Sequence, residues 1–204
     1  MYKSNRHNLL KVLALGSSLL LPYQSSANNL DTNAVALANW TKAGGQVHQE
    51  TKYDFNSRSQ EPIGNIEYYT REVEIDGKKW CITYVDSGPI LPETGKFSPD
   101  RTPNEYDHLS FIRCDKQFDR MPSGDLESFS DLGLDEDIDY GSKSLDNYTS
   151  PQRKQQQIGQ VDPKDPYREI KEKENAEFIR RNKELYDAGQ STYRTLTQRI
   201  LGSK

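Results

Sequence analysis

The sequence is poor in cysteine and histidine, the common ligands of zinc. It contains two cysteines and three histidines, and only His48 and His108 among the histidines lie beyond the N-terminal segment. Neither they nor Cys81 and Cys114 have the short spacings of a zinc site. The glycines form no phosphate-binding loop. The sequence therefore predicts no metal site and no cofactor.

Long apolar runs are absent after the first 27 residues, so we expect no integral membrane span after processing. The N-terminus carries Lys3, Arg6 and Lys11, then an apolar run that ends at Leu21, and then Ser25-Ser26-Ala27. This order is typical of a secretory signal peptide, and the run is shorter than the ~20 residues that an uncleaved anchor needs. We expect cleavage after Ala27 and a protein exported to the periplasm or the extracellular space.

A basic surface is also lacking. The formal net charge is −4, and residues 115–146 contain ten acidic and three basic residues. Residues 164–204 contain ten basic and seven acidic residues. Because a nucleic-acid binder needs a basic footprint on its folded part, the sequence predicts no nucleic-acid partner.

A β-hairpin is the clearest element that the sequence does contain. Two runs rich in β-branched and aromatic residues, 66–75 and 80–85, surround the turn-forming pair Asp76-Gly77. A two-residue loop pairs Val73 with Trp80, and a four-residue loop pairs Ile75 with Trp80. Both registers place the same side chains on the drier face, which we expect to face the core: Tyr69, Arg71, Val73, Ile75, Trp80, Ile82 and Tyr84.

Residues 28–120 are expected to form a small α+β domain. A third strand over Tyr106–Cys114 would join the hairpin in an antiparallel sheet, and a short helix capped by Asp31 would precede it. Residues 47–55 alternate only in part and suggest a weak strand. Cys81 and Cys114 both fall in strand-like runs of an exported chain, so we predict a disulfide between them. The alternative is two free buried thiols.

The rest of the chain is expected to contain a linker and a tail. Residues 121–163 are acidic and polar and predict a mostly disordered linker, with one short helix around Phe129 and Leu132. Residues 164–204 predict a helical tail, whose apolar stripe is interrupted near Glu174 and Asn182 and makes a poor coiled coil. We expect this tail to bind a partner through Phe178, Leu185, Tyr193, Leu196 and Ile200. Alternatively, the apolar residues from Leu185 onward pack on the sheet domain.

Two short segments resemble known motifs. Residues 91–95, Leu-Pro-Glu-Thr-Gly, resemble a sortase sorting signal, but no apolar span or basic tail follows them. The acidic residues from Asp135 to Asp146 resemble the calcium loop of an EF-hand or dockerin. There Tyr140 occupies the place of the turn-forming glycine, so a solvated acidic segment is the favoured interpretation, and calcium binding stays open.

These patterns favour a non-enzymatic function, in which an envelope-associated or secreted protein binds another protein. The alternative is a small secreted hydrolase or nuclease-type toxin that uses His108 and Arg71. That alternative requires His108, Arg71 and nearby tyrosines to converge in one pocket. No catalytic residues are predicted.

Overall fold

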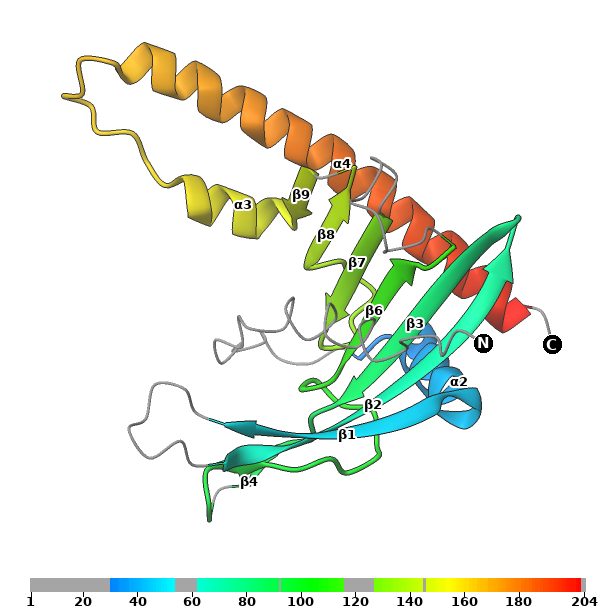
Figure 1. The fold of residues 1–204 in the computed structure, drawn as a ribbon. Helices are drawn as coiled ribbons and strands as arrows, with labels where there is room; N and C mark the ends of the chain where they lie inside the picture. Colours follow the sequence, from blue (N-terminus) through cyan, green and yellow to red (C-terminus); the bar gives the residue numbers. More distant parts are fainter. Residues whose placement is uncertain (1–29, 54–61, 92, 116–126, 145, 203–204) are drawn as a thin grey trace, which may run out of the picture.

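The computed structural model describes residues 30–53, 62–91, 93–115, 127–144 and 146–202. These residues form an antiparallel β-sheet with three helices, so the fold is α+β, but the sheet is larger than the small one expected (Figure 1). The predicted signal peptide, residues 1–27, lies outside the described residues. Within them, no helix is long and apolar enough to cross a membrane.

The sheet contains nine strands in the described part of the chain. From one edge to the other their order is β4-β5-β2-β3-β6-β7-β8-β9, and β1 pairs with the first half of β2. Only the contact of β2 with β5 is parallel. The helices are α2 (Thr32–Gly44), α3 (Pro151–Ile158) and α4 (Arg168–Gly202), and the strands are β1 (Gln46–Tyr53), β2 (Pro62–Ile75), β3 (Lys78–Asp86), β4 (Ile90–Leu91), β5 (Lys96–Phe97), β6 (His108–Arg113), β7 (Glu127–Leu132), β8 (Tyr140–Lys143) and β9 (Asp146–Thr149).

The β2–β3 hairpin has the tighter of the two predicted loops. Val73 pairs with Trp80 and Ile75 pairs with Lys78. Asp76 and Gly77 alone form the loop, and their φ angles are 51° and 70°. Two successive positive φ angles are those of a type I′ turn, whose twist matches that of the flanking strands.

Helix α2 begins where the sequence predicts. The side chain of Asp31 accepts hydrogen bonds from the backbone N–H groups of Asn33 and Ala34, at 2.6 and 3.2 Å. At the other end of the helix, the guanidinium of Arg71 lies 3.5 Å from the centre of the Trp40 ring and donates to the Trp40 carbonyl at 2.8 Å. These contacts hold α2 on the sheet.

The core lies between one face of the sheet and helices α2 and α4. An aromatic cluster at its centre joins the sheet to α4. The rings of Phe111 and Phe129 are stacked with their centres 4.8 Å apart, and the Tyr193 ring meets Phe111 edge-on at 5.2 Å. Both are favourable aromatic geometries, so α4 is part of the core. The hairpin residues predicted for this face contribute four fully buried or nearly buried side chains: Tyr69, Trp80, Ile82 and Tyr84.

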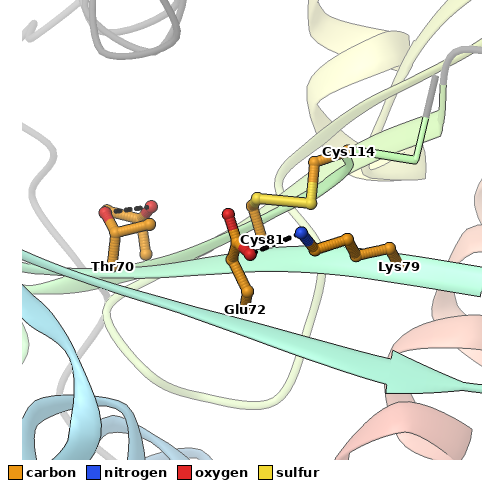
Figure 2. The surroundings of a disulfide bond; sticks show 6 residues. Thr70, Glu72, Lys79, Cys81 and Cys114 are labelled. Atoms are coloured by element: carbon orange, nitrogen blue, oxygen red, sulfur yellow. Dashed lines mark hydrogen bonds and ion pairs between the residues drawn. A yellow bond between two sulfur atoms is a disulfide. The ribbon is translucent and has the colours of Figure 1, made fainter. Parts of the chain in front are cut away.

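Cys81 and Cys114 form the predicted disulfide (Figure 2). Their Cα atoms are 5.8 Å apart, a normal separation for a bridged pair. Cys81 lies in β3, and Cys114 directly follows the neighbouring strand β6, where its backbone N–H donates to the Lys79 carbonyl at 2.9 Å. Figure 2 shows the bond beside the ion pair of Glu72 and Lys79. The disulfide thus joins β3 and β6 at the end of the strand pair that lies away from the long loop between them.

The structure does not confirm a mostly disordered linker over residues 121–163. The described part of that range contains β7, β8, β9 and α3. The short helix expected around Phe129 is wrong, because Phe129 pairs with Phe111 across β7 and β6. Alternate residues of β7 are buried, but two of these three, Glu127 and Asp131, are acidic. Buried acidic residues hide the period-two pattern that would have identified the strand.

Candidate functional site

Helix α4 is divided into a buried half and an exposed half. In the C-terminal half, Tyr193, Leu196 and Ile200 are at most 5% exposed and belong to the core. In the N-terminal half, Ile170 and Phe178 are 58% and 59% exposed. Figure 1 shows this orange half projecting beyond the sheet at β9, together with α3. An apolar stripe on a projecting helix is a typical interaction surface.

Two buried amide side chains determine where α4 leaves the sheet. The side chain of Asn182 accepts from the backbone N–H of Thr149 at 3.0 Å and donates to the Thr149 carbonyl at 2.9 Å. It thus satisfies the backbone groups of β9 that a neighbouring strand would otherwise bond. Gln190 accepts from the N–H of Ile138 at 2.9 Å and donates to the Glu136 carbonyl. An unpaired buried backbone group costs about 1–3 kcal/mol. These bonds therefore fix the crossing point, and the helix before Asn182 projects.

A third polar contact anchors α4 inside the core. The Tyr193 hydroxyl donates to Oδ2 of Asp131 at 2.6 Å. The backbone N–H groups of Asp135 and Glu136 donate to the same carboxyl, each at 3.2 Å. Burial raises the pKa of Asp131 to about 8, although the Tyr193 hydrogen bond opposes this shift. Burial therefore favours the protonated over the ionised form of this carboxyl in the folded protein.

Helix α3 is held in place by Arg153. Its guanidinium lies 2.9 Å from Oδ1 of Asp139 and 4.7 Å from the centre of the Tyr140 ring. The backbone N–H of Ser150, which precedes the helix, donates to the Asp139 carbonyl at 3.1 Å. Burial raises the pKa of Asp139 to about 6, against the lowering effect of a hydrogen bond from the Leu132 N–H and the charge of Arg153. Asp139 thus fixes the start of α3 relative to the sheet.

The exposed half of α4, residues Asp146 and Asn147 of β9, and Lys154 of α3 line an open groove of about 810 Å³. Ile170, Phe178 and Leu185 line it from α4. Their spacings of eight and seven residues keep them on one face of the helix. From α3, the ammonium of Lys154 lies 4.1 Å from the centre of the Phe178 ring. The groove therefore has an apolar floor and a charged rim.

Three of the six charged side chains that line the groove form ion pairs within the described chain. Arg181 forms an ion pair with Asp146 of β9, and Glu177 forms one with Arg180. Glu174 also lines the groove, but no described residue forms an ion pair with it. Its carboxylate is the one acidic group of the groove lining that the described chain leaves unpaired.

The structure separates the five residues that the sequence predicts for partner binding. Phe178 and Leu185 line the groove, and Leu185 also packs partly against the core. Tyr193, Leu196 and Ile200 are buried, so a partner cannot reach them. The expectation of one continuous binding stripe along the tail is therefore corrected, because its second half packs on the sheet as in the alternative.

Arg71 and His108 do not share a site. Arg71 lies over Trp40 on the core side, whereas His108 precedes the core residue Leu109 in β6 and so faces the opposite side of the sheet. Burial, with a smaller effect of Lys52, lowers the pKa of His108 to about 4, so its imidazole is neutral at pH 7. The convergence that the hydrolase or nuclease alternative requires is not present in the described residues.

The acidic residues 135–146 do not gather around one point. Asp139 pairs with Arg153, Asp146 pairs with Arg181, and Asp137 is exposed. Across the described ranges, no group of three or more histidine, cysteine or acidic side chains is placed to hold a metal ion. The calcium-loop resemblance therefore gains no support from the geometry.

A second set of buried carboxylates ties the loop after β3 to the sheet. Asp107 accepts from the Tyr84 hydroxyl at 2.7 Å and from the backbone N–H of Asn104 at 3.0 Å. Asp86 accepts from the backbone N–H of Asp100 at 3.2 Å. These bonds give the proline-rich loop a fixed path, and we assign them a structural role.

Sequence reasoning predicted the α4 side of the groove, with Phe178 and Leu185, but missed helix α3 and the anchoring role of Asn182. Helix α3 fell within the expected linker, although Pro151 at its first position is a helix-start signal. Asn182 counted only as an interruption of the apolar stripe, whereas it is buried and anchors the helix. The groove itself had no sequence signal, because it depends on how α3 and α4 are placed.

Comparison of the chain with protein-family models, with curated proteins and with solved structures found no match. The functional argument therefore depends on the geometry of the groove.

Proposed function

We propose that this is an exported, non-enzymatic protein of the periplasm, cell envelope or extracellular space that takes a helix of another protein into the groove between α3 and α4. The observation that carries the proposal is the exposure of Ile170 and Phe178 inside a groove bounded by two helices. Burying one such side chain in an interface contributes roughly 1.5–3 kcal/mol.

The groove has dimensions that suit a helix. Ile170 and Leu185 are fifteen residues apart on α4, which corresponds to about 22 Å at 1.5 Å per residue. A partner helix of about four turns covers that length. Recognition of this kind uses apolar anchors at helical spacing, and Ile170, Phe178 and Leu185 provide the matching row. With α3 as the second wall, the bound helix completes a three-helix arrangement.

Two features support an extracytoplasmic site of action. The Cys81–Cys114 disulfide is of the kind that persists in oxidising compartments. The basic and apolar N-terminal sequence is typical of an export signal. Neither depends on the groove, so localisation and binding are tested separately.

Site-specific photo-cross-linking tests the binding site. A photoreactive phenylalanine analogue replaces Phe178 in the full chain, expressed in the cells that make the protein. The matched control carries the analogue at Lys183, which is exposed on α4 but does not line the groove. A third chain combines the analogue at position 178 with Ile170→Asp, which removes an apolar contact from the groove.

We expect an adduct from position 178 that is absent at position 183 and weakened by Ile170→Asp. Mass spectrometry of the cross-linked peptide should place the contact in an amphipathic helix of an extracytoplasmic protein. No adduct from position 178, or an adduct of equal strength from both positions, would overturn the proposal. An adduct between two copies of this chain would identify a homodimer instead.

A further inference from the structure

We propose that the helix bound in the groove carries a basic residue midway between two apolar residues that are two turns apart. The proposal rests on the proposed function and specifies the chemistry of the partner. It follows from Glu174, which lies between Ile170 and Phe178 in the sequence and lines the same groove.

Glu174 cannot stay in water when the apolar floor is covered. Residues 170, 174 and 178 follow one another at intervals of four, so they form one row along α4 with steps of about 6 Å. A helix that covers both Ile170 and Phe178 must also cover Glu174. An unpaired carboxylate that loses its water is strongly unfavourable, and a basic residue at the matching position offsets that loss.

The described part of the chain supplies no cation for this carboxylate. Among the basic residues that line the groove, Arg181 is paired with Asp146, and Lys154 lies over the Phe178 ring. Lys173 adjoins Glu174 in the sequence and points about 100° away around the helix. A cation for Glu174 therefore comes from the partner.

A second copy of this chain does not meet the requirement. In a two-fold interface, residue i of one copy contacts residue j of the other, and only residues on the axis meet their own counterparts. Antiparallel pairing of two such rows places Ile170 against Phe178 of the other copy. The axis then passes through position 174, where two Glu174 carboxylates meet. Like charges at that point oppose association, so charge complementarity favours a different protein with a basic centre.

Three designed peptides test this inference on the full chain. Each is a helix of about five turns, held by a lactam bridge on its outer face to reduce the entropy lost on binding. All three carry leucines eight residues apart, with Lys, Ala or Glu midway between them. Binding is measured by fluorescence anisotropy at two salt concentrations, against the unchanged chain and against Glu174→Lys. The control is Glu184→Lys, which makes the same charge change at an exposed residue outside the groove lining.

We expect the Lys peptide to bind at least about tenfold more tightly than the Glu peptide, with the Ala peptide between them. Glu174→Lys should reverse this order, and Glu184→Lys should leave it unchanged. Equal binding of the three peptides would overturn the inference while the groove remained a helix-binding site. If no peptide binds and position 178 also gives no photo-cross-link, the proposed function fails as well. A dimer of the unchanged chain that Glu174→Ala strengthens would also overturn the inference.

Discussion

The buried carboxyl of Asp131 should make the stability of this protein depend on pH. Asp131 is 1% exposed and accepts hydrogen bonds from Tyr193 and from two backbone N–H groups. No described residue forms an ion pair with it. Asp131→Asn keeps the size of the side chain and removes its charge. Since the protonated carboxyl and the amide are both uncharged and each combines an acceptor oxygen with a donor group, the variant mimics the protonated form.

The sign and size of the effect follow from the pKa of Asp131. Burial raises it from 3.8 to about 8 in the folded protein. A raised folded pKa means that the stabilisation is present at low pH and is lost as the pH rises towards that value. Each pH unit between the two values removes about 1.4 kcal/mol. Relative to Asp131→Asn, the unchanged protein should therefore lose about 3 kcal/mol between pH 5 and pH 7.

Urea denaturation at pH 5, 6, 7 and 8 measures this difference, with the fluorescence of the buried Trp80 as the signal. At pH 5, just over one pH unit above the ordinary value of 3.8, Asp131→Asn should already be the more stable by about 2 kcal/mol, and its advantage should grow by about 3 kcal/mol up to pH 7. Asp137→Asn is the control, because it removes the same charge from an exposed side chain in the loop that follows β7. A difference between Asp131→Asn and the unchanged protein that stays constant from pH 5 to pH 8 would refute the reasoning. Titrating groups that do not interact with Asp131 cancel in this comparison, whereas Asp135 and Asp139 are coupled to it electrostatically.

Three further predictions concern the disulfide and the two halves of α4. Replacing Cys81 and Cys114 by alanine should lower the free energy of unfolding by about 3–4 kcal/mol, given a separation of 33 residues; urea denaturation checks this, and an unchanged midpoint would contradict it. Leu196→Ala should cost about 2–5 kcal/mol, whereas Phe178→Ala should cost less than about 0.5 kcal/mol; similar losses for both would mean that the exposed half of α4 is also packed. Asn182→Ala should cost about 1–3 kcal/mol by leaving the backbone of β9 unpaired and should speed hydrogen exchange of the Thr149 amide.

The parts of the fold that the sequence predicts correctly are those set by neighbouring residues. Asp76-Gly77 determines a turn whatever lies elsewhere, and Asp31 caps α2 through bonds that span three residues or fewer. The face of the hairpin that becomes the core follows from alternation alone. The disulfide pairing follows because the chain offers only two cysteines.

The missed strands β7, β8 and β9 are stabilised by contacts from far along the chain. Asp131 and Asp139 look like surface residues, yet each is buried. Asp131 is buried because Tyr193, 62 residues later, donates to it, and Asp139 accepts from the Leu132 N–H and pairs with Arg153. A prediction from composition alone treats such acidic residues as exposed to solvent. Only the fold reveals that their hydrogen-bonding capacity is used internally.

Two interruptions in the apolar stripe of α4 look alike in the sequence and differ in the structure. A polar group inside a packed interface needs a partner. Asn182 finds one in the backbone of Thr149, so it marks the place where the sheet ends and the helix becomes free. Glu174 lies two turns earlier in a groove of the same helix, and the described chain offers it no cation. Asn182 therefore finds its hydrogen-bond partner within the protein, whereas Glu174 needs a cation from a binding partner. This need is why the charge of that partner can be inferred.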